Sequence, residues 1–131
     1  MAHTTDDILM PLAVAVIIDS KIRDPEYHAF VERAHGLLQL FDKPPMTDAE
    51  LRTWFDTQKG ELTELLTSKR RNTTILKVLS KFEDDVEVEN IYDAMVSISV
   101  SDREFVQEES DLIKSAGAIW GFAKPPIKVD R

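Results

Sequence analysis

Acidic residues stand in two matching places along this chain, each time in a short loop and in the helix start that follows it. The first segment runs from Asp19 to Glu26 (DSKIRDPE) and the second from Asp102 to Glu109 (DREFVQEE). Carboxylate oxygens are the hard ligands that calcium and magnesium require. If the two segments converge in the fold, their carboxylates form a strongly negative site that a divalent cation would neutralise.

The candidate metal ligands fall into two ranks. The first rank holds the aspartate that opens each segment and the glutamate in the first turn of the next helix: Asp19, Glu26, Asp102 and Glu109. The second rank holds the other acids of the two segments: Asp24, Glu104 and Glu108. Helix register pairs Glu26 with Glu108, whereas spacing from the leading aspartate pairs it with Glu109. The structural alternative is that an acid at a helix start only offsets the helix dipole, worth about 0.3 to 1 kcal/mol at an exposed N-terminus.

Helices must position these segments, and the chain carries signals for them along its whole length. Capping residues, proline at a first helical position and apolar residues at a spacing of 3.6 mark each one. Residues 96–100 alternate apolar and serine side chains and could form a strand, but their apolar stripe continues the helix before them. The first expected helix begins at Thr4 and ends at about Asp19, and the second covers residues 25–41. The third begins at the Thr47/Glu50 capping box and is divided at Gly60, and the fourth is capped at Asn72 to Thr74 and includes Phe82. The fifth begins at about Asp85, and the last covers Val106 to Trp120 and is stopped by Gly121.

The two acidic segments belong to a longer internal repeat. Each leads into a helix that ends in a similar sequence, FDKPPM at residues 41–46 and FAKPPI at residues 122–127. The two helices carry corresponding apolar stripes: Phe30, Val31, Ala34, Leu37 and Leu38 in the first, and Leu112, Ile113, Ala116, Ile119 and Trp120 in the second. We therefore predict an all-α single domain over residues 1–131, a bundle of about six or seven helices with a pseudo-two-fold repeat of residues 8–46 and 86–127.

Composition narrows the classes of function. The chain has 131 residues, 16 basic and 24 acidic side chains and a net charge of −8, which repels a nucleic-acid backbone. Cysteine is absent, so disulfides and thiolate zinc sites are excluded and a cytoplasmic location is favoured. The apolar run from Ile8 to Ile18 is interrupted by Pro11 and too short to span a membrane, so it predicts a buried helix. The basic cluster Lys69 to Arg71 is typical of a solvated helix end.

Other chemistry in the sequence has simpler explanations. His28 and His35 share a helix face with Glu32 and could hold zinc, but a solvated surface is the commoner setting. The acidic segments lack the spacing of an EF-hand. Paired carboxylates could serve a hydrolase, yet no nucleophile elbow, phosphate loop or dinucleotide fingerprint is present, so we expect no enzyme and no organic cofactor. The aromatic side chains Trp54, Phe55 and Trp120 are expected in the core.

At the two acidic segments the sequence resembles the TerB-like family, whose domains repeat an Asp-Gly-x-hydrophobic loop followed by an acid that opens a helix. Ser20 and Arg103 stand where the family has glycine, so the loop backbone is not carried over. The resemblance implies an all-α module linked to tellurite and stress resistance, which binds a divalent metal through its acids. From the doubled acidic segment we expect a non-enzymatic, acidic scaffold or sensor. It also implies a protein partner, in some members a membrane-linked one, and thus a cytoplasmic place or one peripheral to the inner membrane. A protein-interaction module without metal is the alternative, and the ion, partner and oligomeric state stay open.

Overall fold

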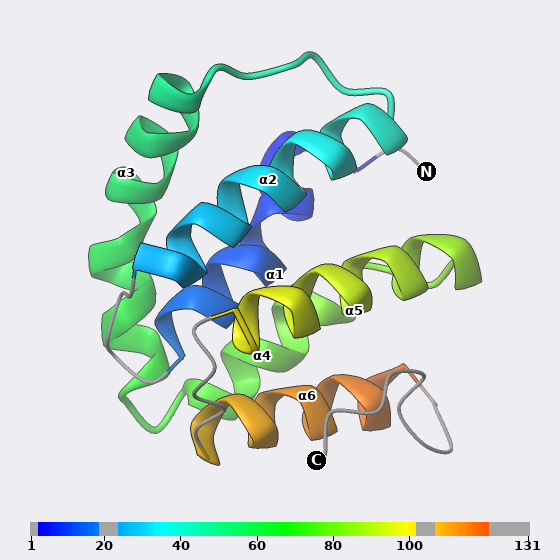
Figure 1. The fold of residues 1–131 in the computed structure, drawn as a ribbon. Helices are drawn as coiled ribbons and strands as arrows, with labels where there is room; N and C mark the ends of the chain where they lie inside the picture. Colours follow the sequence, from blue (N-terminus) through cyan, green and yellow to red (C-terminus); the bar gives the residue numbers. More distant parts are fainter. Residues whose placement is uncertain (1–2, 19–23, 102–106, 121–131) are drawn as a thin grey trace.

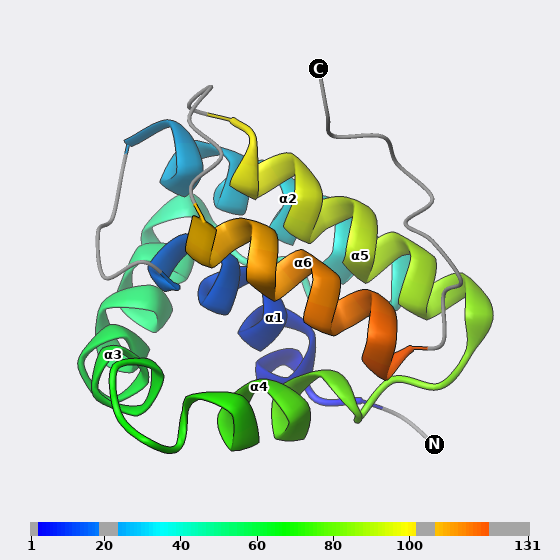
Figure 2. The ribbon, with the colours of Figure 1, turned by 90° about the horizontal axis from the view of Figure 1, so that it is seen from below.

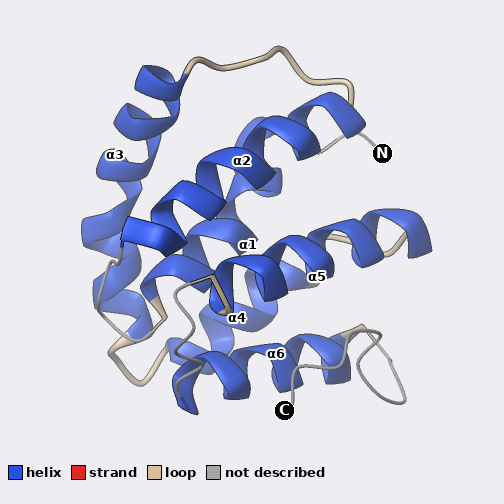
Figure 3. Ribbon diagram, in the orientation of Figure 1, coloured by secondary structure: helices blue, strands red, loops and turns tan. Residues whose placement is uncertain are grey.

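The structure is a computed structural model that describes residues 3–18, 24–101 and 110–120 in full and residues 107–109 as helix backbone. Every regular element in this part of the chain is an α-helix, as Figure 3 shows, so the predicted all-α class is confirmed. The helices are α1 (Thr5–Ile17), α2 (Asp24–Leu40), α3 (Asp48–Leu66), α4 (Arg71–Leu79), α5 (Asp85–Ser99) and α6 (Gln107–Ile119).

Side-chain caps begin three of the helices. Thr4 and Asp7 form a capping box at α1, in which the Thr4 hydroxyl accepts from the Asp7 N–H at 3.0 Å and the Asp7 carboxylate accepts from the Thr4 N–H at 3.1 Å. Thr47 and Glu50 do the same at α3, at 3.1 and 2.8 Å. Asp84 caps α5. These caps satisfy N–H groups that no helical carbonyl can reach, and they fix where each helix starts.

The structure corrects two helix predictions. Gly60 does not divide the third helix, because α3 is continuous from Asp48 to Leu66 and keeps one buried face on both sides of the glycine. A single glycine costs only about 1 kcal/mol relative to alanine, which that buried face outweighs. Asn72 to Thr74 do not cap α4 either, since it begins at Arg71 without a side-chain cap. Instead the Arg71 guanidinium donates to the Leu66 carbonyl at 3.3 Å, so the basic cluster satisfies the end of α3.

The end of α2 is a tight backbone turn. Asp42 has a φ of 60°, in the left-handed region that non-glycine residues seldom adopt. The Lys43 N–H donates to the Leu38 carbonyl at 2.8 Å, and the Asp42 N–H donates to the Gln39 carbonyl at 3.1 Å. These two bonds are those of a Schellman motif, which satisfies the last helical carbonyls. The turn fixes the position of the chain that leaves α2.

Helix α1 lies at the centre of the molecule. The residues from Ile8 to its C-cap Ile18 are almost all buried, and the helix contacts α2, α3, α4 and α5. A helix that is apolar on every side belongs inside a protein, so the predicted buried helix is confirmed. None of the described helices is long and apolar enough to cross a bilayer.

Two antiparallel hairpins are packed against each other around this helix. Helices α1 and α2 form the first hairpin, α5 and α6 form the second, and α1 runs beside α5 in the same direction (Figures 1 and 2). The helix α3 crosses one side of the bundle, and α4 connects it to the second hairpin (Figure 1). The apolar stripes predicted for α2 and α6 are fully or partly buried in the common core. Each acidic segment therefore connects the two helices of one hairpin: α1 to α2 in the first, and α5 to α6 in the second.

Candidate functional site

The described helix ends that border the two acidic segments lie at one end of the molecule. Both views show this gathering (Figures 1 and 2). We call it the loop end, and it is defined by the last residue of α1, the first of α2, the last of α5 and the first of α6: Ile17, Asp24, Ser99 and Gln107. Ser101 and Tyr27 line one common groove, which places the end of α5 beside the start of α2.

Only two of the predicted ligands have described side chains. Asp19, Asp102 and Glu104 lie outside the described residues, as do the side chains of Glu108 and Glu109. Asp24 opens α2 and is exposed. Glu26, two residues later, is completely buried, with 0% of its surface exposed. The structure therefore places these two acids in opposite environments at the same helix start.

The burial of Glu26 means that its carboxylate is not solvated, unlike an acid at an exposed helix start. An ionised carboxylate taken out of water needs hydrogen bonds or an opposite charge to offset the loss of hydration. Glu26 does take part in an interaction, so it is not without a partner. The start of α2 also favours a negative charge, because the helix N-terminus carries partial positive charge. Glu26 is thus an internal group of the loop end and not a solvated acid at an exposed helix start.

Ser99, in the last turn of α5, is a second buried polar residue at the loop end. It is 0% exposed, and its hydroxyl has no hydrogen-bond partner among the described residues. A buried hydroxyl without a partner costs roughly 1 to 3 kcal/mol. Its oxygen is of the same hard type as a carboxylate oxygen. The sequence drew attention to residues 96–100 through their alternation of serine and apolar side chains. The burial of a serine there was not predicted.

The histidines of α2 do not come together with Glu32 in a zinc site. His35 contacts Asp48 at the start of α3, with 2.7 Å between Nε2 and Oδ1, whereas His28 lines a groove of about 670 Å³ with Glu32 and Arg52. Seven residues of helix separate the two histidines by roughly 10 Å along α2. In the part of the chain that the structure describes, no three histidine or carboxylate side chains group to hold a metal. His35 instead ties α2 to α3.

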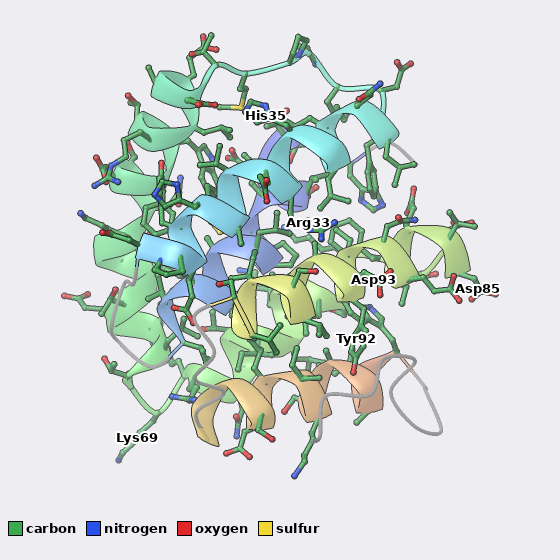
Figure 4. The ribbon with its side chains drawn as sticks, in the orientation of Figure 1. Arg33, His35, Lys69, Asp85, Tyr92 and Asp93 are labelled. Carbon is green, nitrogen blue, oxygen red and sulfur yellow. The ribbon has the colours of Figure 1, made fainter. Side chains whose placement is uncertain are left out.

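A furrow between α2 and α5 extends from the middle of these two helices to the end of the bundle opposite the loop end. It consists of two adjoining cavities of about 360 and 250 Å³ that share Leu40. The first lies between the end of α2 and the start of α5, and its lining includes Leu40, Asp42, Lys43, Asp84, Val86 and Glu87. The second continues along both helices, and its lining includes Glu32, Arg33, Asn90 and Asp93. Arg33 on α2 and Asp93 on α5 stand on the two sides of this furrow in Figure 4.

Exposed apolar side chains in the furrow were not predicted from the sequence. Leu40 is 50% exposed and Val86 is 59% exposed. Both fall outside the apolar stripes that bury α2 and α5, and this departure from the stripe was the available signal. Beside them, His3 contacts Glu87 at 3.1 Å, and its ring lies 4.5 Å from that of Phe82. The described N-terminal residues thus form part of the furrow wall.

Other residues singled out by the sequence have structural roles. The Trp54 indole N–H donates to the Asp6 carboxylate at 2.8 Å, and that of Trp120 donates to the Leu79 carbonyl at 3.0 Å. Trp54 and Trp120 pack against the core, as predicted. Lys69 extends into solvent at the turn between α3 and α4 (Figure 4), which agrees with a solvated helix end.

The TerB-like resemblance depends on the two acidic segments, of which the structure describes Asp24, Glu26 and the backbone from Gln107 onward. The remaining motif positions lie outside the described residues. No known family model, no curated protein and no solved structure matches this chain. The resemblance therefore stays a prediction from the motif residues.

Proposed function

We propose that this chain is a non-enzymatic, acidic scaffold or sensor module whose two acidic loops bind a divalent cation at the loop end. The observation that carries the proposal is the gathering of the four helix ends that border both loops (Figures 1 and 2). The first-rank ligands are Asp19, Glu26, Asp102 and Glu109, and the second-rank ligands are Asp24, Glu104 and Glu108.

Electrostatics supports a cation at this place. Carboxylates that share one neighbourhood repel one another, and a bound cation removes that repulsion. The repulsion matters more where side chains are shielded from water, and the loop end holds the buried carboxylate of Glu26. The hydroxyl of Ser99 adds a buried oxygen at the same end.

The type of donor narrows the choice of ion. All the candidate ligands are oxygen donors, and the chain has no cysteine. Such donors suit calcium, magnesium or manganese better than zinc, which prefers nitrogen and sulfur. The TerB-like resemblance adds the biological setting to the proposal: a stress or tellurite-resistance module of the cytoplasm, or one held at the inner membrane by a protein partner.

Calorimetric titration tests the cation site. Wild type and the double variant Asp19→Asn/Asp102→Asn are titrated with calcium, magnesium, manganese and zinc. A matched control, Asp85→Asn/Asp93→Asn, makes the same change of charge at exposed positions of α5. We expect a saturable heat in wild type and control that is lost in the loop variant. Equal heats in all three proteins would remove the site.

A protein-interaction module without an ion is the second candidate. It is favoured by the exposed apolar side chains of Leu40 and Val86 in the furrow. Exposed apolar groups bordered by polar ones often mark a surface that another protein covers. Binding of a protein partner that persists unchanged in chelator would favour this role over the cation sensor.

A further inference from the structure

The furrow between α2 and α5 has the dimensions of a binding site for a short peptide segment. Its two cavities share Leu40 as a lining residue, so they lie next to each other along α2 and α5. Along α5 the lining extends from Val86 to Ala94, and along α2 from Glu32 to Leu40. Seven or eight residues of helix span about 10 to 12 Å. A partner helix of two to three turns, or a short extended segment, would fill this length.

Apolar contacts in the furrow are available to a partner. Leu40 and Val86 are half or more exposed and line the same cavity from opposite helices. The other large exposed apolar residues of the described chain are Leu76 on α4 and Val100 at the end of α5, and neither lines the furrow. The furrow thus offers two apolar anchor points in one cavity, which the apolar face of an amphipathic segment would cover.

The charge around these anchors selects the partner's chemistry. Five carboxylates line the two cavities: Glu32, Asp42, Asp84, Glu87 and Asp93. Two fully basic side chains, Lys43 and Arg33, stand among them. A cationic segment would be attracted to this rim, whereas an acidic segment, a nucleic acid or an anionic lipid surface would be repelled.

The furrow is built on fixed backbone. The Schellman turn at Asp42 ends α2 abruptly, and the Asp84 cap fixes the start of α5 with bonds of 3.1 and 3.2 Å to the N–H groups of Val86 and Glu87. The contact between His3 and Glu87 joins the N-terminal residues to the same wall. A preformed surface of this kind loses less entropy on binding than a flexible one.

We propose that the furrow docks a basic amphipathic segment of a partner protein, whose apolar residues cover Leu40 and Val86 while its lysines or arginines face the carboxylates. This inference builds on the interaction role named above as the second candidate, and it needs no ion at the loop end. A failed cation titration would therefore not count against the docking proposal, and failed peptide binding would not count against the cation site.

Fluorescence anisotropy with three labelled synthetic peptides tests the partner chemistry. The first is a twelve-residue helix with leucines on one face and lysines elsewhere, the second has the same composition in scrambled order, and the third carries glutamate in place of lysine. We expect the first peptide to bind about tenfold or more tightly than the second, and the third not to bind, with or without chelator. Equal binding of the first two peptides, or no binding of the first, would overturn the proposal.

Matched variants test the place. The double variant Leu40→Ser/Val86→Ser removes both anchors, and Leu76→Ser/Val100→Ser removes two exposed apolar residues elsewhere. Circular dichroism checks that both proteins remain folded. We expect the furrow variant to lose about tenfold or more in affinity for the leucine-lysine peptide and the control to keep wild-type affinity. Equal affinities in the two variants would contradict docking in the furrow.

A second pair of variants separates the furrow's charge from the charge of the whole chain. Glu32→Lys/Asp93→Lys reverses two carboxylates in the furrow, and Glu61→Lys/Glu64→Lys reverses two exposed carboxylates on α3. Both variants change the net charge by the same amount. A larger loss of peptide affinity in the furrow variant is expected, whereas equal losses would show general attraction to an acidic protein and would overturn the proposal.

Discussion

The two ends of this helical bundle use acidic residues in opposite ways. At the loop end, the side chains of Glu26 and Ser99 are both fully buried. In the furrow, the carboxylates that surround the exposed side chains of Leu40 and Val86 are exposed or partly exposed to solvent. A buried carboxylate must be matched by a close partner, since it has lost its hydration. A solvated carboxylate keeps its hydration and acts at a distance through its field. Burial therefore separates a candidate cation ligand from a candidate docking surface.

Among the polar and charged residues, the largest effect is expected from removing the buried acid. Glu26→Ala empties a fully buried side-chain position at the start of α2, and we expect a loss of roughly 2 to 4 kcal/mol in the free energy of unfolding. The matched variant Asp24→Ala removes an exposed acid from the same helix start, and its cost should stay within about 1 kcal/mol. Urea unfolding measures both. Similar small losses in the two variants would mean that burial does not distinguish these acids.

Alkaline pH provides a second test of burial, at Tyr92 on α5. Burial raises the pKa of this hydroxyl above its ordinary value, and the negative charge of Asp93 adds to the effect. The folded state then holds the proton more tightly than the unfolded state. The stabilisation is fully present below the ordinary tyrosine pKa of about 10 and is lost as pH rises through the raised pKa. Ultraviolet absorbance should show a late tyrosine ionisation that Tyr92→Phe removes. Its persistence in that variant would contradict the assignment.

A smaller effect is expected at the partly exposed pair of Asp7 and Lys81. The Lys81 ammonium lies 2.8 Å from the Asp7 carboxylate and holds the pKa of that carboxyl below its ordinary value of 3.8. The stabilisation is present above that ordinary value and is lost as pH falls through the lowered pKa. Lys81→Met should cost at most about 1 kcal/mol at neutral pH. Thermal unfolding at neutral and strongly acidic pH, with Lys77→Met as control, checks this. A cost that stays unchanged in acid would contradict the pairing.

The smallest effect on stability is expected in the furrow. Leu40→Ser and Val86→Ser replace exposed apolar side chains, and each should change the free energy of unfolding by no more than about 0.5 kcal/mol. Leu12→Ala in the buried central helix should cost about 2 to 5 kcal/mol by comparison. Chemical denaturation of the three variants measures the difference. Losses above 2 kcal/mol in the furrow variants would assign Leu40 and Val86 to the core and remove them as docking anchors.

Local signals in the sequence account for most of the fold. The capping box of Thr47 and Glu50 and the Asp24-Pro25 start predicted helix positions to within a residue, because these patterns act through bonds inside the helix itself. Gly60 misled the prediction, since its modest local cost is outweighed by the tertiary burial of α3 on both sides. The start of α4 was misplaced for a similar reason: Arg71 contacts the end of another helix.

The sites were harder to predict than the helices. The acidic pattern identified Glu26, but its complete burial depends on how α2 packs within the bundle. The furrow depends on α2 and α5, which are distant in sequence and meet only after folding. Leu40 and Val86 could have been noticed as apolar residues outside the helix stripes. Their presence in one cavity could not, because periodicity describes a single helix and says nothing of its neighbour.

Manganese titration followed by nuclear magnetic resonance compares the two ends in one experiment, because the paramagnetic ion broadens the signals of nearby amides. The cation proposal predicts saturable broadening of amides at the start of α2, the end of α5 and the start of α6, around Asp24, Ser99 and Gln107. Signals of Leu40 and Val86 at the furrow should stay sharp. Broadening centred on the furrow, or spread over every acidic surface, would contradict a cation site at the loop end.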